Sequence, residues 1–337
     1  MKNLFLKLFF VFFFFGIFSL KAQYTEVINS NKPGFSESPY SVGKGVYQLE
    51  SNFFFRNTAI QPTFTRPQSF GVDFLFRTSF FSEKLELNTQ FTYQRDKVAF
   101  KNIFTSHEFS SGLSRFTIGA KYLIFQQEYT DKSKEVRSWV RRNAFDMKRL
   151  IPSVAVYVGM NTDFVDEFYQ TGGITPKFGI LLQNNLSRDL NVITNFYYDK
   201  AGSDFAEFSY IITATQNFSD RWSAFFENQG IFQEFRNSNN LGTGLAYLFT
   251  KDLQINASAR YLVEGNTQGF YGGLGLSYRI DKHKDAFVNL DENGKQTKDT
   301  PISRYNKKQG GFFSRLFSVF KKKKKKKSTR KRKRTRN

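Results

Sequence analysis

The chain repeats one pattern of apolar and polar positions many times. From residue 46 to 55, the apolar residues Tyr47, Leu49, Phe53 and Phe55 alternate with polar neighbours. A period of two residues places apolar side chains on one face of a β-strand and polar side chains on the other. A helix could not keep these two sets apart, so the pattern predicts a strand with one apolar face.

The alternation returns along the chain and predicts about twelve strands, an even number, as a single-chain bacterial barrel needs. We therefore expect an all-β fold, a transmembrane antiparallel up-and-down barrel over residues 44–280. The apolar faces of the later strands begin at Phe70, Leu85, Phe116, Val154, Phe178, Leu190, Phe208, Trp222, Leu241, Leu253 and Phe270.

The connections between these strands alternate in length. Short turns of one recurring kind lie at 82–85, 187–190, 219–222 and 250–253, whereas longer polar connections lie around 56–67, 95–111, 160–173 and 229–239. Bacterial outer-membrane barrels have short periplasmic turns and long external loops. The sequence thus predicts that both chain termini lie in the periplasm.

One connection differs from the rest, because residues 131–149 show helical spacing of apolar residues with many basic residues opposite. By its place in the alternation this insertion is periplasmic. Two interpretations stay open: an amphipathic helix on the inner leaflet, or a helix packed across the barrel mouth.

Charged residues fall on the polar faces of the predicted strands. A cationic side chain facing lipid costs about 2–4 kcal/mol near the bilayer midplane, so these residues must face an enclosed lumen. Strand lengths of roughly ten residues also fit a membrane barrel better than a soluble β-sandwich, whose strands average about five or six. The candidate lumen-lining residues are Glu50, Asp73, Arg77, Glu86, Arg115, Lys121, Lys177, Glu227, Arg260 and Arg279.

The first 43 residues carry an export signal and a lead. Lys2 and Lys7 precede an apolar run that ends at Leu20, which is typical of a secretory signal peptide over residues 1–22. Residues 23–43 then contain Pro33, Gly34 and Pro39, so we expect an extended lead, or a plug in the barrel mouth, rather than a strand.

The charge of the chain is concentrated at its C-terminal end. Residues 281–337 hold 21 basic and 5 acidic residues, which gives +16 of the chain's net charge of +21. A block of like charge is expected to be disordered. Within this tail we predict an amphipathic membrane-surface segment over 310–320 with adjacent lysines. Its candidate residues are Phe312, Phe313, Leu316, Phe317, Phe320, Lys321 and Lys327.

Several stretches carry a family resemblance. Residues 31–39 (NKPGFSESP), 43–45 (GKG), 48–50 (QLE) and 112–122 (GLSRFTIGAKY) resemble the outer-membrane transporter family labelled meta-pathway of phenol degradation, in a Bacteroidota-like form. The resemblance covers about residues 23–280 and implies a barrel and a channel, without naming a solute. The sequence departs from the family pattern at Lys32 and in the basic tail.

Catalytic chemistry has little support in the sequence. The two histidines, His107 and His283, lie in a predicted external loop and in the tail, and the chain has no cysteine. We therefore expect no enzyme, no catalytic residues, no cofactor and no metal.

Two functions remain open. The first is an outer-membrane channel or porin-like transporter that passes small solutes passively through a polar lumen. The second is a structural or interaction barrel whose basic tail tethers it to anionic lipid, cell wall or an export machine. Outer-membrane lipid is a partner in both, and nucleic acid is an unfavoured one because the chain is exported.

Overall fold

The computed structural model describes residues 27–58, 68–97, 109–128, 138, 145–234, 237–265 and 267–283. The chain divides into two units, 1–284 and 285–337, and all described residues belong to the first. Among the described residues, no helix is long and apolar enough to cross a membrane.

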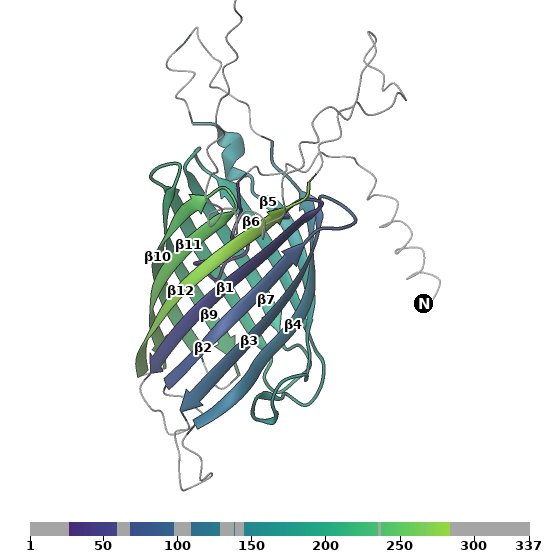
Figure 1. Cartoon of the computed structure of the whole chain (residues 1–337), viewed down its shortest axis with the longest axis vertical. Coiled ribbons are helices and arrows are strands. Elements are labelled where there is room, and N and C mark those ends of the chain that lie inside the picture. Colours follow the sequence, from purple (N-terminus) through teal and green to yellow (C-terminus); the bar gives the residue numbers. More distant parts are fainter. Residues whose placement is uncertain are drawn as a thin grey trace, which may run out of the picture. The chain divides into compact units, whose positions relative to one another are not determined.

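Twelve antiparallel strands form a closed barrel, in which each strand pairs with its sequence neighbours and β1 also pairs with β12 (Figure 1). This architecture confirms the predicted fold class and strand number. The strands are β1 (Val46–Thr58), β2 (Gln68–Thr78), β3 (Leu85–Lys97), β4 (Phe109–Phe125), β5 (Ser153–Asn161), β6 (Thr175–Asn185), β7 (Leu190–Asp199), β8 (Glu207–Asn217), β9 (Trp222–Gln233), β10 (Asn237–Thr250), β11 (Leu253–Glu264) and β12 (Thr267–Asp281).

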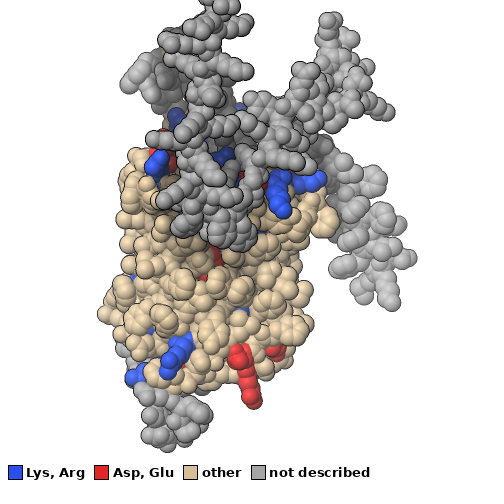
Figure 2. Space-filling model, viewed as in Figure 1, with Lys and Arg blue, Asp and Glu red and all other residues tan. Residues whose placement is uncertain are grey.

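The burial of side chains is reversed with respect to a soluble protein. Arg77, Glu50 and Glu86 are fully buried inside the barrel, whereas Phe53 and Leu274 on the outer face are 58% and 66% exposed. Figure 2 shows the same distribution, since charged side chains gather near the two ends and other residues cover the wall between them. The apolar faces therefore point outward, as in a barrel surrounded by hydrocarbon.

We call the end of the barrel where Val46 begins β1 and Asp281 ends β12 the terminal rim, and the opposite end the loop rim. The tight turns predicted from the sequence lie at the terminal rim, and the β9–β10 and β11–β12 connections at the loop rim are also short. In the β8–β9 turn, the Ser219 hydroxyl accepts hydrogen bonds from the amides of Arg221 (3.3 Å) and Trp222 (3.2 Å). Serine hydroxyls that bind the backbone two residues later stabilise turns, and Ser82 and Ser187 do the same.

The predicted long connection over 229–239 is wrong. Strand β9 continues to Gln233 and β10 begins at Asn237, so a short connection joins them. The polar residues at these strand ends still form ladder pairs, such as Asn239 with Gly230. Backbone pairing continued through residues whose polarity indicated a loop, because polar side chains at a strand end can face water.

The predicted helix over 131–149 lies mostly outside the described residues. Its described end forms a short 3-10 helix, η2 (Met147–Leu150), capped by the Asp146 carboxylate, which accepts a hydrogen bond from the Lys148 amide (3.2 Å). A second 3-10 helix, η3 (Glu167–Tyr169), lies in the β5–β6 connection at the loop rim.

Candidate functional site in the barrel lumen

Residues 28–43, which we call the lead loop, run into the barrel from the terminal rim and return to it. At its start, the Ile28 amide donates a hydrogen bond to the Lys251 carbonyl (2.9 Å) in the β10–β11 turn. At its tip, Phe35 contacts Tyr271 of β12, with ring centroids 5.6 Å apart. Near its end, the Val42 amide donates to Glu86 of β3 (2.9 Å).

Arg77 joins two carboxylates on the wall beside the lead loop. Its guanidinium donates to Glu50 Oε1 (2.9 Å) and, through Nε and Nη2, to both oxygens of Glu86 (2.8 and 3.0 Å). None of the three side chains is exposed. Burial of charge is costly unless the ions are paired and hydrogen-bonded, and the two-pronged contact of Arg77 with Glu86 meets this condition.

The same two carboxylates bind the backbone of the lead loop. Glu50 Oε2 accepts hydrogen bonds from the amides of Asn31 (3.0 Å) and Lys32 (3.1 Å). Lys121 extends the cluster, because its ammonium lies 3.0 Å from Glu86 and donates to the Ser38 carbonyl (2.8 Å). The charged cluster of the wall is therefore also the attachment point of the loop.

A second ion pair, which Arg260 forms with Glu227 in the middle of β9, holds the tip of the lead loop. Glu227 Oε2 accepts hydrogen bonds from the amides of Phe35 (3.0 Å) and Ser36 (3.3 Å), and Arg260 pairs with Oε1. The Arg260 guanidinium also lies over the Phe35 ring, 3.3 Å from its centroid. At Gly34, an added Cβ would come within 2.9 Å of Glu227 Oε2, so the close approach favours glycine.

Lys32 supplies a cation from the loop itself. Its ammonium binds Asp73 Oδ2 at 2.9 Å, while Gln90 and Thr92 donate to Oδ1 of the same carboxylate. Burial on its own would lower the pKa of Lys32, but the charge and hydrogen bond of Asp73, together with Tyr271 and Glu50, outweigh burial and raise that pKa above its ordinary value. The residue at which the sequence departs from the family pattern is thus a buried ion-pair partner.

The wall from β4 to β8 is more apolar. Leu123, Leu181 and Ile211 belong to a buried cluster there, and Tyr40 of the lead loop packs against it. The Tyr40 hydroxyl lies 2.9 Å from that of Ser153. The lead loop is therefore held by packing on one side of the lumen and by ion pairs on the other.

The predicted lumen residues fall into separate groups. Glu50, Arg77, Glu86 and Lys121 form one cluster, Glu227 pairs with Arg260, and Asp73 pairs with Lys32.

The other predicted lumen residues lie outside these groups. Nearer the loop rim, Lys177 lies 3.8 Å from Asp199. Arg279 binds Asp252 (2.9 Å) at the terminal rim, apart from the rest. Arg115 has no ion pair with any residue that the structure describes, and its side chain is exposed.

Sequence reasoning missed some polar residues that hold the loop. Asn195 of β7 accepts a hydrogen bond from the Glu37 amide (2.7 Å) and donates one to the Glu37 carbonyl (2.9 Å). Gln183 accepts one from the Ser38 hydroxyl (2.8 Å). Both lie on polar faces of predicted strands, so alternation could have found them, but a search confined to charged residues could not.

The loop rim is partly covered from within. In the β5–β6 connection, Tyr169 is buried and its hydroxyl donates to Asp96 of β3 (3.1 Å). The Asp166 amide donates to the Leu113 carbonyl of β4 (3.0 Å), which holds the connection against the wall. This connection therefore reaches across part of the barrel mouth.

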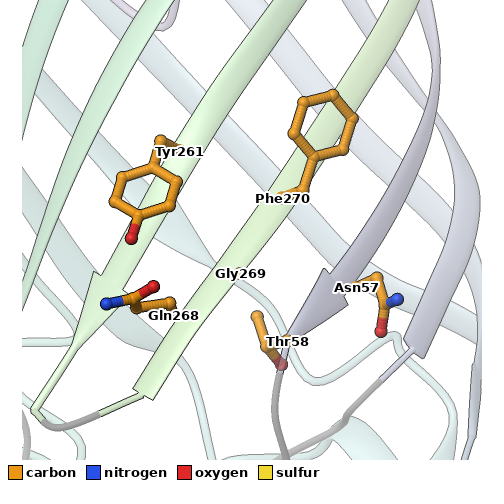
Figure 3. Close-up of a pocket in the computed structure, with 6 residues that line it drawn as sticks. All are labelled: Asn57, Thr58, Tyr261, Gln268, Gly269 and Phe270. Carbon is orange, nitrogen blue, oxygen red and sulfur yellow. The ribbon is translucent and has the colours of Figure 1, made fainter.

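A hollow of about 560 Å³ lies on the outer face near the loop rim rather than in the lumen. Figure 3 shows its six lining residues, with Tyr261 on β11, Phe270 on β12 and Asn57 on β1. Tyr261 and Phe270 are half exposed and belong to the outward set. The hollow is thus a part of the lipid-facing surface and lies apart from the charged clusters.

A closed antiparallel barrel with an apolar outer face and a charged, hydrogen-bonded interior is a membrane-spanning β-barrel of the outer-membrane type. Within that class, the family model described as "Putative MetA-pathway of phenol degradation" matches residues 30–280, and the chain belongs to this family. The resemblance to this family noted in the sequence is thereby confirmed, whereas its Bacteroidota-like form stays a prediction. A search of curated proteins found no match.

Solved structures of outer-membrane channels are similar to the chain in fold. The COG4313 outer membrane channel from Pseudomonas putida F1 has 8% identity and a TM-score of 0.49, covering 75% of this chain and 100% of that one. The KdgM porin in complex with disordered oligogalacturonate has 8% identity and a TM-score of 0.42, covering 69% and 99%. The CymD monoaromatic hydrocarbon channel has 9% identity and a TM-score of 0.41, covering 72% and 90%.

Proposed function

We propose that the chain is an outer-membrane channel that passes small solutes passively through a polar lumen, with the lead loop narrowing the passage. The observation that carries the proposal is Arg115. In the β3–β4 ladder, Arg115 is the register partner of Thr92, and partners point to the same face of the sheet. The Thr92 hydroxyl binds Asp73 in the lumen, so Arg115 also faces the lumen. Its side chain is nevertheless exposed, which is expected if water enters the lumen from the loop rim.

The lead loop is the restricting element of this proposal. It lies across the lumen from Glu50 of β1 to Asn195 of β7 and is hydrogen-bonded to both. A solute must pass beside it or displace it. The tip of the loop is held by hydrogen bonds of its backbone to Glu227 and Asn195, so removing these contacts is expected to widen the passage while leaving the strands paired.

Single-channel recording in planar lipid bilayers tests the channel and the role of the loop together. We compare the mature chain with a variant lacking residues 28–42 and with the double variant Glu227→Gln, Asn195→Ala, which releases the tip alone. We expect measurable conductance in the mature chain and larger unitary conductance in both variants. Folded protein without conductance in all three would contradict the proposal.

A second candidate, a structural or interaction barrel, is favoured by the dense packing near the terminal rim. Glu50 and Glu86 are fully buried there and both bind Arg77, so a fully paired charged cluster occupies this end of the lumen. In this alternative the tail binds anionic lipid or cell wall. Co-sedimentation of the mature chain with anionic vesicles and with cell-wall material, lost when residues 285–337 are removed, would support it.

We further propose that the terminal rim faces the periplasm, in agreement with its short turns. The chain has no cysteine, so single cysteines give a clean readout. Ser219→Cys lies at the terminal rim and Gln170→Cys at the loop rim. On intact cells, a membrane-impermeant maleimide is expected to label Gln170→Cys alone, and the reverse pattern would contradict the orientation.

A further inference from the structure

The wall between β4 and β7 carries hydrogen-bond donors that the lead loop does not use. The Lys177 ammonium lies 4.7 Å from the centroid of the Tyr197 ring and 5.6 Å from that of Tyr157. Its distance to the Asp199 carboxylate is 3.8 Å, which is longer than a hydrogen bond. The ammonium therefore keeps donor capacity toward the lumen.

Arg115 is the second cation on this part of the wall. A register shift at Thr92 and Tyr93 leaves Ser114 unpaired, so that Arg115 and then Thr117 face the lumen. Thr117 binds Asn161, which in turn donates to Asp199 (2.7 Å), the partner of Lys177. A chain of hydrogen bonds thus connects the wall beside Arg115 to the wall beside Lys177.

The nearby acidic groups are already occupied. Asp199 accepts hydrogen bonds from Asn161 and from the Lys200 amide (2.8 Å). Asp166 binds the Leu113 amide. The guanidinium of Arg115 has no ion pair among the described residues, so this region offers unused donors rather than unused acceptors.

Tyr197 marks where a carboxylate already lies on this wall. Its side chain is 5% exposed, and its hydroxyl faces the Glu37 carboxylate of the lead loop, with which it has a hydrogen-bonding interaction. Glu37 also interacts electrostatically with Tyr157. This part of the wall therefore already receives one carboxylate, from the chain itself.

We propose that Arg115 and Lys177 form a binding site for a small organic carboxylate, and that Glu37, beside the Tyr197 hydroxyl, places an internal carboxylate at its edge. Charge-assisted hydrogen bonds from guanidinium and ammonium groups are the usual means of holding a carboxylate. The inference rests on the proposed channel function for the route of access, whereas binding itself does not require conduction.

Isothermal titration of the purified mature protein in detergent, with succinate as the probe, tests the site. 1,4-Butanediol and 1,4-diaminobutane have the same chain length with neutral and cationic ends, so they separate recognition of a carboxylate from recognition of the carbon chain. We expect succinate to bind and the two comparators not to bind.

Substitutions then assign the binding to these residues. Arg115→Gln and Lys177→Gln are each expected to weaken succinate binding about tenfold, since each removes a hydrogen bond to a charged group. Glu37→Gln removes the competing internal charge and is expected to strengthen it. Arg95→Gln is the matched control, because Arg95 lies over Phe109 on the outward face near the same rim.

Each outcome decides the proposal. Equal binding of 1,4-butanediol, or equal loss of binding in Arg95→Gln, would overturn it, and so would wild-type protein that does not bind succinate. Heat-modifiable migration on gels identifies the variants that fold. If a Gln variant does not fold, Arg115→Lys and Lys177→Arg take its place, and both are expected to retain partial succinate binding. Succinate binding without conductance would reject the channel and leave the site, whereas conductance without binding would reject the site alone.

Discussion

At the scale of single residues, the interior depends on complete pairing of buried charge. Arg77 satisfies Glu50 and Glu86 together, and both carboxylates also accept hydrogen bonds from backbone amides of the lead loop. Loss of one partner of a buried pair leaves an uncompensated charge, which costs more than the pair itself contributes.

We therefore expect Arg77→Met to reduce the free energy of unfolding by about 3–5 kcal/mol. Arg279→Met is the comparison, because its partner Asp252 is 32% exposed and solvent screens the pair, so the expected loss is about 1 kcal/mol or less. Urea unfolding in detergent micelles, followed by tryptophan fluorescence, measures both. Equal losses would contradict the role of Arg77 in the cluster.

Gly34 is the residue where the loop approaches the wall most closely. Gly34→Val places side-chain atoms against Glu227, whose oxygen would lie 2.9 Å from the new Cβ. We expect the loop tip to leave the wall and the Phe35–Ser36 bond, whose flanking amides are now held by Glu227, to become a site of cleavage by chymotrypsin. Limited proteolysis of the folded barrel checks this result, and resistance equal to that of the wild type would show that the tip tolerates the side chain.

At the scale of elements, each strand has to satisfy lipid on one face and the lumen on the other. Leu274 lies in the middle of β12 on the outer face, whereas Phe249 lies on β10 next to the terminal rim. The cost of a charge on the lipid face falls from the bilayer midplane toward the interface.

Leu274→Arg is accordingly expected to destabilise the barrel by about 2–4 kcal/mol, and Phe249→Arg by about 0–1 kcal/mol. Reversible folding into lipid vesicles under a urea gradient measures the difference. If the two substitutions cost the same, the membrane midplane does not cross β12 near Leu274.

At the scale of the whole molecule, closure is the condition for stability in hydrocarbon, because unpaired backbone groups of an open edge find no water there. The closure is made by β1 and β12, which pair from Val46–Asp281 to Thr58–Gly269.

Removal of residues 267–337 deletes β12 and exposes the edges of β1 and β11. We expect this truncation to abolish folding into vesicles, as read by heat-modifiable migration on gels. Removal of residues 285–337 leaves β12 complete and is expected to preserve folding. A truncated chain that folds without β12 would mean that β1 and β11 can close the barrel by themselves.

The sequence by itself determined the strands and their faces. Alternation around Phe53 and Leu274 is a local property, because the two-residue period of a strand follows from backbone geometry at each position. The same alternation placed Glu50 and Arg77 on polar faces. Polarity was a poorer guide to strand ends, where Asn237 and Asn239 continue β10.

Tertiary structure alone decided what the lumen contains. The Phe35 amide and Glu227 are 192 residues apart along the chain, and no local pattern connects them. Closure of the barrel brings Glu50, Glu86 and Asn195 around the lead loop, and the register shift beside Thr92 sets where Arg115 points. Side-chain direction follows from the local backbone, whereas partners across a lumen follow from the closed ring of strands.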